Sequence, residues 1–297
     1  MIFIVLATLT GVLMLVILRW LDSTQSHVFY ALIFNYLSAF VCGILNKLFF
    51  YSQVKMEIGK EAWALTVMEG ILFITVFYWM AQTTKYYGLS VTAVANKMSL
   101  IFPVMTAHLI FKEPMDGLKW LGLLLALISI YLVTYNGDEK QVVNRKKIIF
   151  PILVFIGSGI IDSIINYGNK TYIQGAHQQL VFTTFVYLFA LLTGLVYMKI
   201  VPADKNGGKK FYYQESFSWK NTIFLGILLG IPNFYNLFFI IQALSSGILL
   251  SSQIFLILNL SNIVLSTIVG VFFFNEKKKW INWLGILTAL LSVGMIR

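Results

Sequence analysis

Ten apolar stretches dominate this chain, and each has about the length that a membrane-crossing helix needs. An α-helix must be about 20 residues long to cross the hydrocarbon core, because it rises about 1.5 Å per residue. With 59% hydrophobic and 11% charged residues and a mean hydropathy of +0.81, the chain is too apolar for an ordinary water-soluble domain. We therefore expect an all-α membrane protein with transmembrane helices at residues 2–19, 28–46, 63–85, 89–111, 118–135, 148–169, 180–200, 221–243, 247–274 and 280–296.

One segment of the chain is repeated 163 residues later. Residues 111–129 read FKEPMDGLKWLGLLLALIS and residues 274–292 read FNEKKKWINWLGILTALLS, with 9 of 19 positions identical. Shared apolar composition explains a few matched leucines, but not Glu, Trp and Gly at the same spacing. We infer an internal duplication with five-helix repeats at residues 1–136 and 148–297. Because five is an odd number, the second repeat starts on the opposite side of the membrane, and the two repeats are predicted to be inverted.

Inverted repeats are typical of secondary transporters. They place a substrate site near the membrane midplane between the repeats, and rocking of the repeats opens that site to each side in turn. The connecting segments are too short to fold as separate domains, so the function is expected to lie within the bilayer.

Basic residues lie at the span ends and in the loops. The side reached after odd-numbered spans carries 14 of them and the other side 7, so the positive-inside rule predicts that both termini are outside. The net charge of +10 would suggest a nucleic-acid partner in a soluble protein, but here it serves topology and contact with anionic lipid, and no nucleic acid is expected. Cys42 is the only cysteine, and we expect no metal and no cofactor.

The repeat itself resembles a known family. Ten spans with a Phe-x-Glu turn and a following Trp-Leu-Gly in both halves are similar to the EamA family of the drug/metabolite transporter (DMT) superfamily. Residues 90–93 leading into residues 99–104 are similar to the small-residue entry and the Ser-x-x-x-Pro of that family's fourth helix. The resemblance implies an exporter or exchanger of small polar metabolites such as amino acids, sugars, sugar phosphates or nucleosides, coupled to a proton or a counter-substrate.

Asp162 is the first of three ionisable candidates inside the spans, where such groups suggest function by default. Ser158, Asp162, Asn166 and Asn169 follow one another at spacings of four, four and three, so they share one face of the sixth span. That face predicts a polar wall of the substrate cavity, with Asp162 carrying a proton or facing a substrate cation. A packing seam between helices is the alternative.

Lys97 and Glu69 are the other two ionisable candidates. Lys97, beside Asn96 and a third to half of the way along the fourth span, could bind an anionic substrate group or pair with Asp162 or Glu69. Snorkelling of its ammonium to the interface is the alternative. Glu69 lies in the first turn or two of the third span, about 9 Å deep, and is either a site residue or a carboxylate that reaches water or a nearby helix end.

Polar groups on three further spans complete the candidate site. Pro232 removes a backbone donor beside Asn233, with Asn236 one turn on, which favours a hinge or a site in the eighth span. Asn259 and Asn35 lie on polar stripes of the ninth and second spans that suit either a site or packing.

Glu113 and Glu276 come from the repeated Phe-x-Glu turns. Each precedes a predicted helix start, so we interpret both as caps or loop anchors favoured by the helix dipole.

The predicted function is therefore a secondary active transporter in a bacterial inner (cytoplasmic) membrane, with a homodimer left open. A lipid-linked carrier or flippase on the same fold is the alternative. An intramembrane enzyme is less favoured, because His27, His108 and His177 are not clustered and no nucleophile or phosphate-binding motif is visible.

Overall fold

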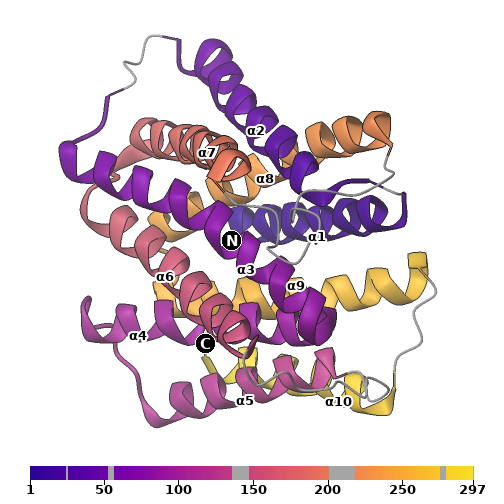
Figure 1. Ribbon diagram of the computed structural model, residues 1–297. Helices are drawn as coiled ribbons and strands as arrows, with labels where there is room; N and C mark the ends of the chain where they lie inside the picture. The colour runs from indigo at the N-terminus through magenta and orange to yellow at the C-terminus, as the bar shows by residue number, and fades with distance from the viewer. Residues whose placement is uncertain (25, 53–56, 136–146, 201–217, 275–278, 297) are drawn as a thin grey trace. The chain divides into compact units, whose positions relative to one another are not determined.

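The structure is a computed structural model that describes residues 1–24, 26–52, 57–135, 147–200, 218–274 and 279–296 (Figure 1). Over these ranges it contains helices and no strand. The helices are α1 (Ile2–Ser23), α2 (Val28–Phe50), α3 (Lys60–Met98), α4 (Ile101–Leu109), α5 (Gly117–Thr134), α6 (Ile149–Thr171), α7 (Gly175–Ile200), α8 (Trp219–Ser245), α9 (Ser251–Phe274) and α10 (Trp280–Ile296).

Eight of the described helices are long and apolar enough to cross a membrane: α1, α2, α3, α5, α6, α7, α8 and α9. In α3 the qualifying part is Lys60–Met80, while α10 is apolar but shorter and α4 has 9 residues. The prediction of an all-α integral membrane protein is confirmed.

The boundary predicted between the third and fourth spans is wrong. The prediction separated residues 63–85 from 89–111 around Gly88, whereas α3 continues without a break to Met98 and α4 follows it. A single glycine lowers helix stability by only about 1 kcal/mol relative to alanine, so it does not by itself end a helix.

Pro103 explains where the break does occur. Proline has no N–H to donate to the carbonyl four residues earlier, which is that of Ser99. That carbonyl accepts a hydrogen bond from the Phe102 N–H instead, at 2.9 Å. As a result Lys97 lies in the last turn of α3, not a third to half of the way along a separate fourth span.

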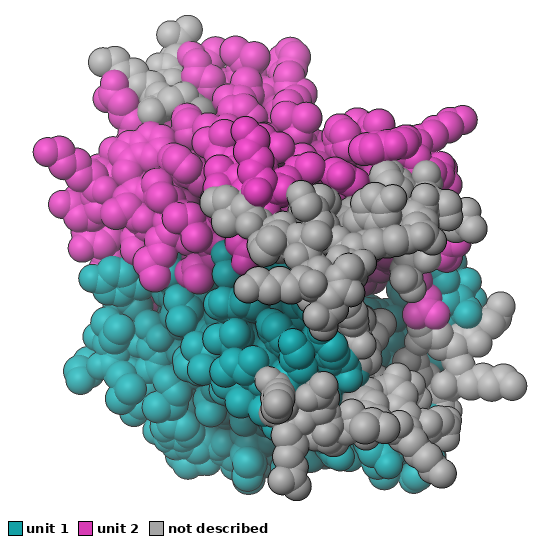
Figure 2. All heavy atoms as spheres, viewed as in Figure 1, with its two compact units in different colours: residues 1, 75–167, 246–297 teal, residues 2–74, 168–245 magenta. Residues whose placement is uncertain are grey.

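Two compact units divide the chain (Figure 2). Unit 1 comprises residues 1, 75–167 and 246–297, and unit 2 comprises residues 2–74 and 168–245. Each unit includes parts of both predicted repeats. A repeat is recognised by sequence and a compact unit by packing, so these are different divisions, and the two repeats stay a prediction.

In unit 1, α5 and α10 lie side by side and run in opposite directions (Figure 1). The Ser129 hydroxyl donates to the Gly285 carbonyl at 2.9 Å, and the Ser292 hydroxyl donates to the Gly122 carbonyl at 2.7 Å. The two serines are 163 positions apart, as are the two glycines. The contact therefore joins matched positions of the sequence repeat through a reciprocal pair of hydrogen bonds.

The core of unit 1 is apolar and contains buried side chains from α4, α5, α9 and α10 together with the residue that precedes α4. Its members are Leu100, Val104, Leu123, Ala126, Ile130, Val133, Leu256, Leu260, Ile263 and Ala289.

Glu113 caps a helix, as predicted, but the helix is α9 and not the one that follows it in sequence. Its buried carboxylate accepts hydrogen bonds from the backbone N–H groups of Ser251 and Ser252 at 3.0 and 3.1 Å, and from both serine hydroxyls. The first N–H groups of a helix have no partner within it, and its dipole favours a negative charge there. The N-cap of α5 is Asp116, and Glu276 lies outside the described residues.

In unit 2, two glycines bring α8 close to α2. A Cβ atom at Gly226 would lie 2.5 Å from the Ala31 carbonyl oxygen, and one at Gly230 would lie 2.5 Å from the Asn35 carbonyl oxygen. The Gly-x-x-x-Gly pair is thus a close-packing contact, and α1 and α7 also pack against α8.

Replacing Glu113 with alanine is expected to destabilise the protein by roughly 2–4 kcal/mol, because buried donors at the start of α9 lose a charged acceptor. The measurement is the Tm of the detergent-purified chain at a fixed scan rate. Glu113→Gln keeps the shape without the charge and should give a smaller loss. Glu61→Gln, at an exposed position in the first turn of α3, is the control; a Glu113→Ala variant that melts with the wild type would contradict the capping role.

Candidate functional site

A polar face of α6 meets the end of α3 in unit 1. The Asn96 side-chain amide donates to the Ser158 hydroxyl at 3.0 Å and also approaches the Met80 sulfur at 3.7 Å. One residue further, Lys97 interacts electrostatically with Asp162, which lies one helical turn after Ser158. The structure therefore brings together four polar residues that the sequence placed on two different spans.

Lys97 and Asp162 are both half-buried. Asp162, one of the two carboxylates considered as partners for Lys97, interacts with it electrostatically. An isolated charge is costly to bury, and an opposite charge offsets part of that cost. The end of a helix also favours a cation, and Lys97 lies in the last turn of α3. The interaction therefore offsets part of the cost of burying each charge, and either side chain can exchange this internal contact for a ligand.

Asn166 lies one turn beyond Asp162 on the same helix. Its side chain is fully buried, and neither its amide nitrogen nor its amide oxygen has a hydrogen-bond partner among the described residues. A buried amide without partners costs about 1–3 kcal/mol, so such a group calls for an explanation.

The last member of the polar face predicted on α6 lies outside this cluster. That residue, Asn169, accepts a hydrogen bond from the Ser245 hydroxyl at 2.7 Å, and Gln179 donates to Ser245 at 2.5 Å. These residues belong to unit 2, where they join the ends of α6 and α8 to α7. For Asn169, the packing alternative describes the observed contact.

A second polar cluster lies in the interior of unit 2. The Tyr187 hydroxyl of α7 donates to the Asn233 backbone and side-chain oxygens of α8 at 2.6 and 3.0 Å. The Asn233 amide donates in turn to the Asn35 side-chain oxygen of α2 at 3.0 Å. Tyr36 stacks on Tyr187 with ring centroids 6.3 Å apart, and Glu69 of α3 interacts electrostatically with Tyr187.

The alternative in which Glu69 reaches water is wrong. Its side chain is 0% exposed. The reason is that α3 begins at Lys60, earlier than predicted, so Glu69 lies about 14 Å from the helix start at 1.5 Å per residue. It is therefore an interior residue of unit 2, close to the middle of the apolar part of α3.

Two other candidates make contacts within the helix packing. The Asn236 amide donates to the Ala7 carbonyl of α1 at 2.6 Å, and the Asn259 amide donates to the Phe255 carbonyl of its own helix at 3.0 Å. His108 forms a hydrogen bond through Nδ1 with the Glu113 carbonyl at 2.9 Å. In the structure these side chains support helix contacts and a turn.

Tyr187 is the interior residue that sequence reasoning missed. A tyrosine in an apolar stretch resembles the many aromatic side chains that face lipid, and no spacing rule separates the two. The polar run Gln179, Thr183 and Thr184 on the preceding turns of α7 was the one available signal, since these side chains are buried as well.

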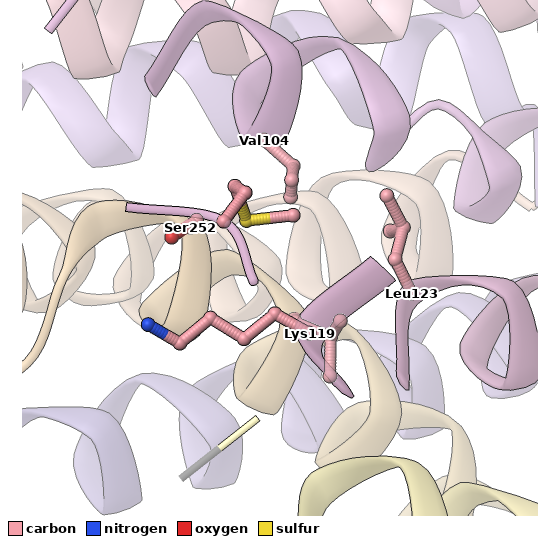
Figure 3. Close-up of a pocket in the computed structure, with 6 residues that line it drawn as sticks. Val104, Lys119, Leu123 and Ser252 are labelled. Carbon is pink, nitrogen blue, oxygen red and sulfur yellow. The ribbon is translucent and has the colours of Figure 1, made fainter. Parts of the chain in front are cut away.

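A small, largely apolar pocket lies in unit 1 and contains none of the predicted site residues (Figure 3). In Figure 3 the Lys119 side chain extends toward Ser252, and its ammonium donates to the Pro114 carbonyl at 3.1 Å. The pocket is lined by Val104, Met115, Lys119, Leu123, Ser252 and Leu256. Within the described part of the chain, no group of three or more His, Cys, Asp or Glu side chains could hold a metal ion.

Comparison with known proteins finds a similar fold and gives no activity. No protein-family profile matches the chain. It is 29% identical over 226 residues to an uncharacterized protein of Haemophilus influenzae, covering 75% of this chain and 72% of that protein. A solved crystal structure has a similar fold, with a TM-score of 0.69 and 15% identity over 98% of this chain and 97% of that one.

Replacing Tyr187 with phenylalanine is expected to lower stability by about 1–3 kcal/mol, because two buried oxygen atoms of Asn233 lose their donor. Thermal unfolding of the purified variant measures the effect. Tyr131→Phe makes the same change at an exposed position of α5 and should melt with the wild type. Equal stability of the two variants would show that the Tyr187 hydroxyl does not support unit 2.

Proposed function

We propose that this protein is a secondary active transporter, an exporter or exchanger of small polar metabolites, that works by alternating access between two inverted five-helix repeats. The observation that carries the proposal is the Lys97–Asp162 pair, two half-buried charged side chains in the helices of an integral membrane protein. Charged groups in such helices are costly and usually mark a substrate or ion pathway.

The α5–α10 contact supports the inverted repeats. Two matched serines donate to two matched glycine carbonyls across antiparallel helices. A two-fold relation between the halves produces this reciprocity. If the serine of the first half contacts the glycine of the second, the same symmetry brings the serine of the second half to the glycine of the first. In this arrangement the end of α3 together with α4 forms the fourth span, and α10 forms the tenth.

Two further observations support the class of protein. The Phe-x-Glu and Trp-Leu-Gly pattern resembles the EamA family, and the similar protein from Haemophilus influenzae comes from a bacterium. We accordingly assign the protein to a bacterial inner membrane, and the distribution of its basic residues favours both termini outside. Neighbouring candidates on the α3 and α6 faces, Asn96 and Asn166, would line the substrate path beside the pair.

The first experiment measures thermal stabilisation of the detergent-purified chain by amino acids, nucleosides, sugars and sugar phosphates. A ligand that binds the folded state raises the Tm. We expect an anionic ligand to stabilise the wild type and to lose that effect in Lys97→Gln, because its charge partner is removed. If no compound in the set raises the Tm, a lipid-linked carrier or flippase is favoured over a metabolite transporter.

Replacing Asp162 with asparagine is expected to abolish or uncouple transport while folding and membrane insertion are retained. The amide keeps the size of the side chain but cannot carry the negative charge that balances Lys97. Flux of the stabilising ligand into proteoliposomes, normalised to inserted protein, measures the effect, and Glu61→Gln is the matched control at an exposed position. Wild-type flux through well-inserted Asp162→Asn would exclude the role assigned to this carboxylate.

A further inference from the structure

Most polar side chains of the candidate sites already have partners within the protein. The amide of Asn96 donates to Ser158, that of Asn236 donates to Ala7, and that of Asn259 donates to Phe255. Asn233 is engaged by both Asn35 and Tyr187. These groups would have to give up an existing hydrogen bond before they could bind a ligand.

Asn166 differs from all of them. Among the residues that the structure describes, it is the one amide side chain whose nitrogen and oxygen are both buried and both without a hydrogen-bond partner. An amide in this position offers two donors and an acceptor side by side. A ligand group that both accepts and donates, such as a hydroxyl or a carboxamide, would satisfy it, whereas an apolar group or a bare anion would not.

The position of Asn166 relates it to the charged pair. It follows Asp162 by four residues on α6, so the two side chains lie on one face about 5–6 Å apart. Asp162 interacts with Lys97, and both are half-buried and so remain within reach of a small molecule. One turn of α6 therefore separates Asp162, which interacts with the Lys97 ammonium, from an amide that lacks a described partner.

We infer that Lys97 and Asn166 form the two ends of a binding track for a compact anion that carries a hydroxyl or carboxamide about one helical turn from its negative charge. This inference rests on the proposed transport function and names the substrate class for the same site. The anionic group takes the place of Asp162 beside Lys97, and the hydroxyl or carboxamide fills the hydrogen-bonding positions of Asn166. Ligand discrimination is then assigned to Asn166 and charge selection to Lys97.

Four small acids of similar length test the assignment on the full chain in detergent: 4-hydroxybutanoate, succinamate, butanoate and 4-aminobutanoate. In the proposed arrangement the carboxylate meets Lys97 and the far end of the chain meets Asn166. We expect the hydroxyl and carboxamide compounds to raise the Tm, and butanoate to require about tenfold higher concentration for the same shift, because it leaves Asn166 without a hydrogen bond.

Asn166→Leu is the decisive variant. Leucine has nearly the same size and no polar atoms, so the ligand-free variant should melt at or above the wild-type temperature, since no buried amide remains without partners. It should bind the hydroxyl compound and butanoate equally. Asn262→Leu is the matched control, because its amide oxygen is also buried without a described partner, and it should retain the wild-type preference.

Each other outcome overturns the assignment. The Asn166 role fails if butanoate binds the wild type as well as 4-hydroxybutanoate, if Asn166→Leu keeps the preference, or if none of the four compounds raises the Tm. Tighter binding of 4-aminobutanoate than of 4-hydroxybutanoate would instead identify Asp162 as the second contact, with a ligand ammonium. These are binding measurements, so they stay separate from the flux assay. If the chain distinguishes 4-hydroxybutanoate from butanoate but transports no ligand, only the transport proposal fails. If it transports a ligand but does not distinguish these two acids, only the role assigned to Asn166 fails.

Discussion

The absence of water from the membrane interior is the constraint on which the described structure depends. Each helix satisfies its own backbone hydrogen bonds, so the polar side chains and the helix ends are what remain to be partnered, and neighbouring helices must supply the partners. Glu113 closes the start of α9, and the serines of α5 and α10 donate to carbonyls across their interface. Because lipid is as apolar as leucine, such contacts select one packing of apolar helices over another.

The two polar clusters meet this constraint in different ways. In unit 2, Tyr187, Asn233 and Asn35 form a continuous chain of hydrogen bonds in the interior, and such a network stabilises one arrangement of its helices. In unit 1, Lys97 and Asp162 interact electrostatically, and Asp162 lies one helical turn from an amide without described partners. The unit 2 cluster also contains a buried donor without a described hydrogen-bond partner, the Asn35 side-chain nitrogen, so it is the interaction of two oppositely charged side chains beside Asn166 that sets the unit 1 cluster apart. This difference is why the candidate site is centred on Lys97, Asp162 and Asn166.

Sequence reasoning succeeded where one local property decides the outcome. Apolar length predicted a membrane protein, and eight of the described helices are long and apolar enough to cross a membrane. The spacing of Ser158, Asp162 and Asn166 predicted one shared face, because helical geometry is periodic. It erred around Gly88 and Pro103, where two helix-weakening residues compete and the strength of each break decides the boundary. The depth of Glu69 was misjudged for a different reason, because α3 begins at Lys60 and not near Trp63.

By itself, then, the sequence determined that the chain is an all-α membrane protein, that residues 111–129 and 274–292 are identical at 9 of 19 positions, and that few ionisable groups lie inside its predicted spans. These follow from composition, periodicity and identity, which need no knowledge of neighbours. Only the tertiary structure decided which helix Glu113 caps, that Lys97 interacts with Asp162, and that Tyr187 completes the interior of unit 2. Contacts between residues far apart in the chain depend on how apolar helices pack, and side chains of similar hydrophobicity carry little local information about that choice.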